Sequence, residues 1–198
     1  MIEFLKEIDT QLFLFLNGIH SPFGDFVMYW LSHRFIWIPL YAFLLYLLYR
    51  HYGMEAFILL VLVALLITIS DQASVRLFKN VFLRLRPCHE PALEGMVYTL
   101  GRCGGKYGFI SSHASNSFAL SVFIALLLWN KIRYMAVFML VWSSMVSYSR
   151  VYLGVHYPGD ILAGAFVGAA EAFLIYGLWL LIRKKFLKPD DQAMMSRE

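Results

Sequence analysis

The chain has 198 residues, of which 60% are hydrophobic and only 15% charged, and its mean hydropathy is +0.64. Ordinary soluble domains have about 45–50% apolar and about 25% charged residues, so this composition excludes a soluble globular domain and indicates an integral membrane protein. The net charge of +4 is small and its basic residues sit at segment ends, which argues against a nucleic-acid partner.

The first 20 residues predict an amphipathic helix that lies in the membrane interface. Four apolar residues of the segment 2–16 share one helical face, and polar residues occupy the remainder, before Asn17-Gly18 ends the run. The four are Leu5, Ile8, Leu12 and Leu16. The segment has neither the basic start nor the cleavage site of a signal peptide, so we expect it to remain in the protein.

Five apolar segments are predicted to cross the membrane as helices, each needing about 20 mostly apolar residues. They are residues 35–49 with a start near Asp25, 56–69 continuing to Lys79, 111–129, 134–148 and 161–182. A sixth span over residues 11–30 is the alternative to the interfacial helix, although Asn17, Gly18, Pro22 and Asp25 interrupt it. The expected fold is an all-α transmembrane bundle that forms one domain over residues 1–198.

Gly164 and Gly168 put two small residues one turn apart in the last segment. Such a pair lets a neighbouring helix approach closely. Because a five-helix bundle has many internal interfaces, we expect this face to pack within the chain, with dimerisation as the alternative.

Basic residues in the short turns predict which ends face the cytoplasm. The cytoplasmic set is Arg50, Lys131, Arg133, Arg183, Lys184, Lys185 and Lys188. This orientation makes residues 183–198 a cytoplasmic tail and residues 81–110 an outer loop. Cys88 and Cys103 both lie in that loop. In an exported loop they are expected to form a disulfide, which closes about 15 residues and stabilises the fold by roughly 3 kcal/mol.

Residues 149–160 concentrate the groups of phosphate chemistry in one turn between two apolar segments. Arg150 ends one segment, His156 lies in the connection, and Asp160 follows in the first turn of the next helix, after Pro158. A carboxylate four residues after a histidine can hold one imidazole nitrogen as N–H, which leaves the other nitrogen free to attack phosphorus. A structural salt-bridged turn is the alternative interpretation of this stretch alone.

Two further stretches carry groups that bind phosphate. Lys79 and Arg86 are seven residues apart, so they point the same way if the helix continues to Pro87. Ser111, Ser112 and His113 begin the third apolar segment, where free backbone N–H groups attract anions, the serines can cap the helix or bind the anion, and His113 can act as a general acid. Separately, these stretches also fit a headgroup-binding basic cluster and an ordinary helix cap.

Together the three stretches resemble the signature motifs of the type 2 phosphatidic acid phosphatase family, which is related to vanadium haloperoxidases. The first and third motifs match fully. In the second, Ile110 and Ser112 stand where the family usually has proline and glycine.

The resemblance implies roles for the matching residues. His156 attacks phosphorus and forms a phosphohistidine, Asp160 orients His156, and His113 protonates the leaving oxygen and later activates water. The phosphoryl oxygens are held by Lys79, Arg86, Ser111, Ser112 and Arg150. No metal and no cofactor are expected, because positive side chains can stabilise the transferred group.

The expected function is hydrolysis of a lipid phosphate or diphosphate in a bacterial inner membrane, with the site facing the periplasm or the cell exterior. Undecaprenyl diphosphate is the favoured substrate; a lipid A phosphatase and a phosphatidylglycerol phosphate or phosphatidate phosphatase are the alternatives. Two other classes remain open. A lipid phosphotransferase shares the phosphohistidine, and a non-catalytic membrane binding module needs neither histidine.

Overall fold

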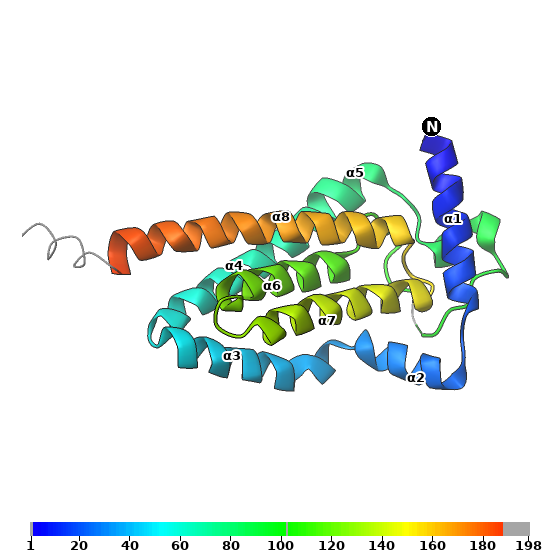
Figure 1. Ribbon diagram of the computed structural model, residues 1–198. Coiled ribbons are helices and arrows are strands. Elements are labelled where there is room, and N and C mark those ends of the chain that lie inside the picture. The colour runs from blue at the N-terminus through cyan, green and yellow to red at the C-terminus, as the bar shows by residue number, and fades with distance from the viewer. Residues whose placement is uncertain (1, 102, 188–198) are drawn as a thin grey trace, which may run out of the picture.

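A computed structural model describes residues 2–101 and 103–187 of the chain (Figure 1). Eight α-helices follow one another: α1 (Ile2–Gly18), α2 (Pro22–Leu31), α3 (Ile38–Tyr52), α4 (Glu55–Ala73), α5 (Asn80–Phe82), α6 (Ser112–Leu128), α7 (Arg133–Tyr152) and α8 (Pro158–Ile182). The expected all-α fold is confirmed for this part of the chain. The end of the expected tail, residues 188–198, lies outside the described residues.

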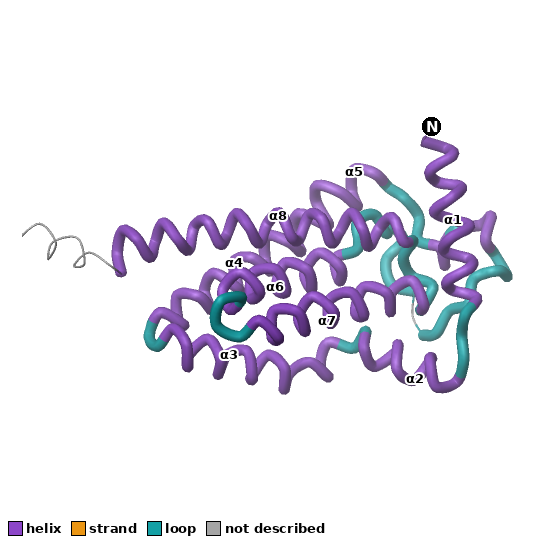
Figure 2. Tube along the Cα trace, in the orientation of Figure 1, coloured by secondary structure: helices purple, strands orange, loops and turns teal. Residues whose placement is uncertain are grey.

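Helix α6 forms the centre of the bundle and packs against α4, α7 and α8 (Figure 1). Its position explains why Phe123, Ile124 and Leu128 are almost completely buried. The long helices run alongside one another, whereas α1 crosses them at one end, where the long loop before α6 also gathers (Figures 1 and 2). The site residues discussed below lie at this end.

The expected number of five membrane spans is not confirmed. Two helices are long and apolar enough to cross a membrane, Glu55–Phe82 and Pro158–Phe186, and a third span results if the bent pair of α2 and α3 counts as one. Helix α6 is apolar but has only 17 residues. Helix α7 has 20 residues, but the serines that it turns toward its neighbours, among them Ser143, Ser147 and Ser149, lower its hydropathy.

The predicted continuous helix from near Asp25 to Tyr49 is wrong. Helix α2 ends at Leu31, the 3₁₀ turn Arg34–Trp37 follows, and the axis bends by 67° before α3 continues. Pro39 explains why a 3₁₀ turn precedes α3, because a proline inside an α-helix lacks the N–H donor and its ring clashes with the carbonyl of the residue four before it, here Phe35. At the start of α3 the same proline is tolerated.

Gly164 and Gly168 bring α8 into backbone contact with α6, as expected for packing within the chain. A Cβ on Gly168 would lie 2.1 Å from the carbonyl oxygen of Ser115, and one on Gly164 would lie 2.7 Å from that of Ser111. Both distances are below 3.0 Å, closer than a real Cβ atom approaches another heavy atom. The contact matters for the site, since α6 carries His113 and α8 carries Asp160.

Replacing Gly168 by alanine is therefore expected to destabilise the bundle by about 1–3 kcal/mol, the usual range for overpacking. Gly177→Ala is the matched control, because it lies in the same helix and a Cβ there meets nothing within 4 Å. Thermal unfolding in detergent measures both variants. Equal transition temperatures for the two would contradict this packing of α8 on α6.

Candidate active site

The turn between α7 and α8 holds His156 against the last residues of α7. The carbonyl of Arg150 accepts hydrogen bonds from the amides of Val155 (3.1 Å) and His156 (3.2 Å). Gly154 makes the turn possible with φ of 75°, and a Cβ there would lie 2.5 Å from the carbonyl oxygen of Tyr98. The sequence therefore fixes the position of His156 relative to Arg150 through backbone geometry.

Asp160 meets the imidazole of His156 from the first turn of α8. Oδ2 of Asp160 lies 3.4 Å from Nδ1 of His156 and accepts a hydrogen bond from the backbone N–H of Tyr157 at 3.1 Å. Asp160 is fully buried and His156 nearly so. An Nδ1–H facing this carboxylate leaves the lone pair on Nε2, which is the tautomer that a nucleophilic histidine needs.

Three cations surround His156 closely enough to change its protonation. Burial is the first cause that lowers the pKa of this imidazole well below its ordinary value, and the positive charges of Arg86, Arg150 and Lys79 lower it further. A hydrogen bond with the backbone of Gly108 acts in the opposite direction. The balance keeps His156 neutral.

Lys79 reaches the start of α6. Its Nζ donates to Oγ of Ser112 at 2.5 Å, and the same oxygen lies 2.6 Å from Oγ of Ser74. Ser112 replaces the glycine usual in the second motif, so this hydroxyl is a contact that the usual residue cannot make. Ser111 acts differently, because its buried Oγ accepts from the amide of Ala114 at 3.4 Å and caps the helix.

Lys79 and Arg86 do not share one helix. The helix ends at Phe82, Leu83 adopts a left-handed conformation with φ of 50°, and Arg86 is extended. Residues 84–86 instead pair with residues 106–108: Arg86 N donates to Lys106 O (3.1 Å) and Gly108 N to Arg84 O (2.9 Å). The helical spacing was thus the wrong reason for placing the two cations together, because folding of the outer loop positions Arg86.

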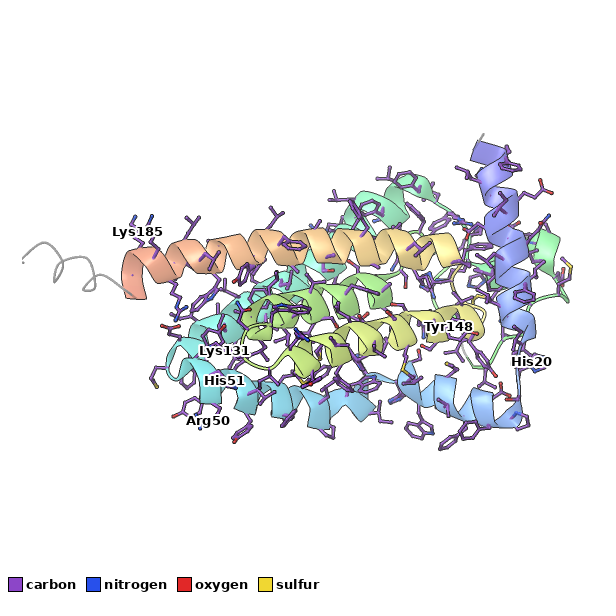
Figure 3. The ribbon with its side chains drawn as sticks, in the orientation of Figure 1. His20, Arg50, His51, Lys131, Tyr148 and Lys185 are labelled. Carbon is purple, nitrogen blue, oxygen red and sulfur yellow. A yellow bond between two sulfur atoms is a disulfide. The ribbon has the colours of Figure 1, made fainter. Side chains whose placement is uncertain are left out.

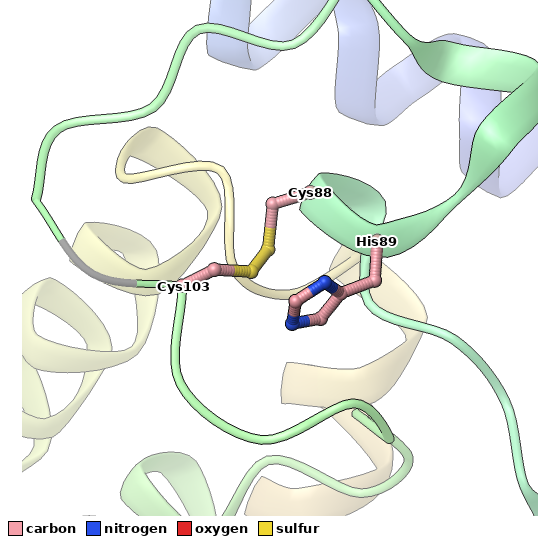
Figure 4. A group of neighbouring side chains, drawn as sticks. All are labelled: Cys88, His89 and Cys103. Atoms are coloured by element: carbon pink, nitrogen blue, oxygen red, sulfur yellow. A yellow bond between two sulfur atoms is a disulfide. The ribbon is translucent and has the colours of Figure 1, made fainter.

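The outer loop holds the guanidinium of Arg86 through backbone oxygens. Its terminal NH1 donates to the carbonyl of Cys103 at 2.7 Å and its Nε to that of Tyr107 at 3.3 Å. Cys103 is joined to Cys88 in a disulfide, with His89 beside it (Figure 4). Because both sulfurs are bonded to each other, they offer no thiolate to a metal. The disulfide fixes the loop segment that carries the acceptor for Arg86.

His113 and Arg150 are the remaining residues of the site around His156. His113 is within electrostatic reach of Arg150, His156, Lys79 and Arg86. Arg150 donates through NH1 to Oγ of Ser32, while its buried Nε has no partner among the described residues. A buried guanidinium with a free donor is suited to bind an anion.

A cavity of 610 Å³ opens beside His113 and Ser112. Its remaining wall is mostly apolar and comes from α2, α3, α4, α6 and α7, with Trp37, Tyr41 and Trp142 among its larger side chains. A group held between the cations and His113 therefore has an apolar space next to it.

Sequence reasoning missed three residues that touch the site. Arg84 donates to Oδ1 of Asp160 at 3.0 Å, and Asp9 of α1 accepts from Arg84 at 2.7 Å. A Cβ on Gly108 would lie 3.0 Å from Arg86, 3.2 Å from Asp160 and 3.5 Å from His156. Arg84 could have been found from the sequence, because it lies two residues before Arg86 of the first motif. Nothing in the sequence linked Asp9 or Gly108 to the motifs.

The low pKa of His156 predicts how the rate of phosphorylation depends on pH. Since the neutral imidazole is the expected nucleophile and its pKa is depressed, this rate should not fall as the pH drops through about 6.5, the ordinary histidine value. Arg86→Gln removes the positive charge with the largest effect on the pKa of His156, so this pKa should rise. The acid limb of the pH–rate profile should therefore move to higher pH. Because a phosphate monoester itself titrates near about pH 6, the ratio of single-turnover rates of the two proteins is the quantity to measure. A pH-independent ratio would contradict the prediction.

Comparison with known proteins agrees with the three motifs. The family model described as PAP2 superfamily matches residues 56–184. The chain is 45% identical over 179 residues to the lipid A 4'-phosphatase of Bacteroides thetaiotaomicron, covering 89% of this chain and 79% of the relative. It is 37% identical to that of Porphyromonas gingivalis, covering 94% and 79%. An undecaprenyl-diphosphatase of Sulfolobus acidocaldarius is 30% identical, covering 87% and 75%.

The fold agrees as well. The crystal structure of a transmembrane PAP2 type phosphatidylglycerolphosphate phosphatase from Bacillus subtilis superposes with a TM-score of 0.71 at 22% identity, covering 92% of this chain and 89% of that one. The long sequence matches and the shared fold lead to one conclusion. The chain belongs to the PAP2 superfamily and is a membrane lipid phosphatase.

Proposed function

We propose that this protein removes a phosphate from lipid A, at the 4' position, through a phosphohistidine at His156. Sequence analysis favoured undecaprenyl diphosphate. The comparisons support the alternative better, because two lipid A 4'-phosphatases are 45% and 37% identical to this chain, whereas the undecaprenyl-diphosphatase is 30% identical.

The observation that carries the proposal is the gathering of three cations and His113 around His156, with His113 also lining a mostly apolar cavity. Lys79, Arg86 and Arg150 all act on the imidazole of His156, and His113 lines the cavity. A phosphate held by these cations faces His156, and an apolar lipid portion has space beside His113. A soluble phosphate ester needs no such cavity.

In the proposed mechanism Nε2 of His156 attacks phosphorus, so that a P–N bond forms as the bond between phosphorus and the sugar oxygen breaks. His113 gives a proton to the leaving oxygen. It then takes a proton from water, whose oxygen forms a bond to phosphorus as the P–N bond to His156 breaks, which releases inorganic phosphate and restores the neutral imidazole. Asp160 keeps Nδ1 of His156 protonated, and the charge that develops on the phosphoryl oxygens is offset by the cations and the N-terminus of α6.

Each proposed oxygen ligand has a specific attachment. Lys79 is oriented by Ser112, Arg86 by the carbonyl of Cys103, and Arg150 by Ser32. Ser111 caps α6 by accepting from the amide of Ala114, which leaves its O–H free to donate to a phosphoryl oxygen. Ser112 contributes by orienting Lys79, because its Oγ accepts from Lys79 and also contacts Oγ of Ser74.

We further propose that the site faces the periplasmic side of a bacterial inner membrane. Arg50, Lys131 and Lys185 gather at the end of the bundle opposite α1 and the outer loop (Figure 3). Basic residues prefer the cytoplasmic side. The disulfide in the outer loop fits an oxidising compartment.

A panel of purified lipids tests the substrate. Phosphate release by the full chain in detergent is measured on lipid A, undecaprenyl diphosphate, phosphatidylglycerol phosphate and phosphatidate at equal surface concentration. The proposal expects the highest kcat/KM on lipid A, with loss of the 4'-phosphate seen by mass spectrometry. A higher value on undecaprenyl diphosphate, or transfer of the phosphate to an added lipid alcohol instead of water, would overturn it.

Phosphate release is also expected to persist in EDTA. The described residues supply positive charge from Lys79, Arg86 and Arg150, and this charge can stabilise the transferred group as a metal ion does. The assay compares the rate before and after chelation and dialysis. Complete loss that is restored by a divalent cation would contradict the prediction.

A further inference from the structure

Asp160 is connected to the N-terminal helix through a single guanidinium. Arg84 donates from NH1 to Oδ1 of Asp160 at 3.0 Å and from NH2 to Oδ2 of Asp9 at 2.7 Å. The other oxygen of Asp160 faces His156. A chain of contacts therefore runs from Asp9 through Arg84 and Asp160 to the imidazole.

The charges of Asp9, Arg84 and Asp160 depend on one another. Asp160 has no exposed side-chain surface, whereas Asp9 and Arg84 expose 16% and 24% of theirs. A buried carboxylate is costly unless it is paired and hydrogen-bonded. The planar guanidinium of Arg84 serves the two carboxylates from separate nitrogens, NH2 and NH1, a fixed spacing that the single ammonium nitrogen of a lysine does not reproduce. Arg84 thus pairs with the Asp160 carboxylate and holds it pointed at His156.

Asp9 fixes the arrangement from a second direction. Its Oδ1 accepts the backbone N–H of Gly159 at 2.7 Å, so the same carboxylate binds the guanidinium and the first turn of α8. A Cβ on Gly159 would lie 2.7 Å from Oδ2 of Asp9, which shows how close this approach is. The guanidinium of Arg84 also lies 3.9 Å from the ring centroid of Tyr157.

Apolar contacts hold α1 in the position that the hydrogen bonds of Asp9 require. Phe13 of α1 is fully buried, and its ring packs edge-on against that of Tyr157 with centroids 5.4 Å apart. Asn17 is also buried and donates to the carbonyls of Tyr152 and Tyr98, each at 2.9 Å. Helix α1 is thus fixed to the turn that carries His156.

We propose that Arg84 and Asp9 are positioning residues for the nucleophile, and that α1 is a part of the catalytic apparatus in addition to any role at the membrane surface. The inference rests on the proposed role of His156. Arg84 orients Asp160, Asp9 orients Arg84 and the α8 backbone, and Asp160 sets the imidazole. Neither Arg84 nor Asp9 needs to touch the lipid.

The test compares Asp9→Asn, Arg84→Lys and Arg84→Gln with Glu7→Gln, an exposed acidic residue of the same helix. On the lipid that the unmodified protein hydrolyses best, Asp9→Asn and Arg84→Gln should lower kcat roughly 10–100-fold, the effect typical of residues that orient an active group through a hydrogen bond. KM should stay within about twofold, because no contact to the substrate is lost. Arg84→Lys should lower kcat less than Arg84→Gln, since the lysine keeps a positive charge for Asp160.

A second measurement does not depend on the substrate. Nitrogen-15 spectra of histidine-labelled protein report the tautomer and environment of His156, with its signals assigned by their absence in His156→Gln. Asp9→Asn and Arg84→Gln should shift the Nδ1 signal, and Glu7→Gln should leave it unchanged. This arm decides the inference even if the lipid panel finds no substrate, a result that would defeat the proposed function alone.

A purely structural tether of α1 predicts a different pattern. The variants would then melt at lower temperature, but at a temperature where they are folded they would show the kcat and the His156 signals of Glu7→Gln. That result overturns the inference. A rise in KM at constant kcat overturns it as well, because it would place Arg84 or Asp9 at the substrate.

Discussion

His156→Ala is expected to lower the rate of phosphate release about a millionfold, which is the scale of removing a nucleophile. The imidazole is the group through which the phosphoryl transfer is proposed to pass, and the neighbouring cations cannot form the covalent intermediate. His156 is nearly fully buried in a turn whose backbone bonds do not use its side chain, so the variant is expected to fold. The measurement is phosphate release together with acid-labile phosphate on the protein in a quenched reaction.

His51→Ala is the control for this variant. His51 lies near the C-terminal end of α3, at the end of the bundle away from α1 (Figure 3). Its rate should equal that of the unmodified protein. Turnover by His156→Ala within tenfold of the control would show that His156 is not the nucleophile.

Asp160→Asn is expected to lower kcat roughly 10⁴-fold, as for the aspartate that orients a catalytic histidine in serine hydrolases. One oxygen of Asp160 accepts from Tyr157 and faces His156, and the other accepts from Arg84. An asparagine has a single acceptor oxygen. Its NH₂ group must point either at the donor of Arg84 or at Nδ1 of His156, and the second arrangement favours the tautomer with the proton on the attacking nitrogen.

Glu94→Gln is the control, because Glu94 is an exposed acidic residue of the outer loop. The single-turnover rate separates the chemical step from product release. The loss should be in the formation of the phosphohistidine, with KM nearly unchanged. A loss that appears only as weaker substrate binding would show that Asp160 does not act on the nucleophile.

Helix formation and the identities of the motif residues could be predicted from the sequence. Apolar segments with charged ends indicate helices, and α4, α6, α7 and α8 lie close to the predicted residues. The packing of the small residues of α8 was also predicted, since Gly164 and Gly168 face a backbone that leaves no room for a side chain. These features are local, so periodicity and residue type suffice to recognise them.

The expected number of membrane spans was not confirmed for a physical reason. Helix α6 is short and α7 turns serines inward, so neither is both long and apolar enough by itself to identify a span. The bend between α2 and α3 was also missed, because the run of apolar residues concealed it.

The geometry of the candidate site was decided by the tertiary structure. Lys79 and Arg86 were expected to meet through helical spacing, but Leu83 ends the helix and the outer loop returns Arg86 to the site by pairing with residues 106–108. Ser111 and Ser112 look equivalent in the sequence, yet one caps α6 and the other binds Lys79.

The sequence by itself determined that this chain forms apolar helices and carries the residues of phosphoryl transfer, because both are properties of neighbouring positions. Only the tertiary structure decided that Asp9 and Arg84 reach Asp160. Asp9 is 75 residues from Arg84 and 150 from Gly159, the backbone that it also binds. Contacts between such distant positions depend on how the helices pack, and no spacing along the chain encodes them.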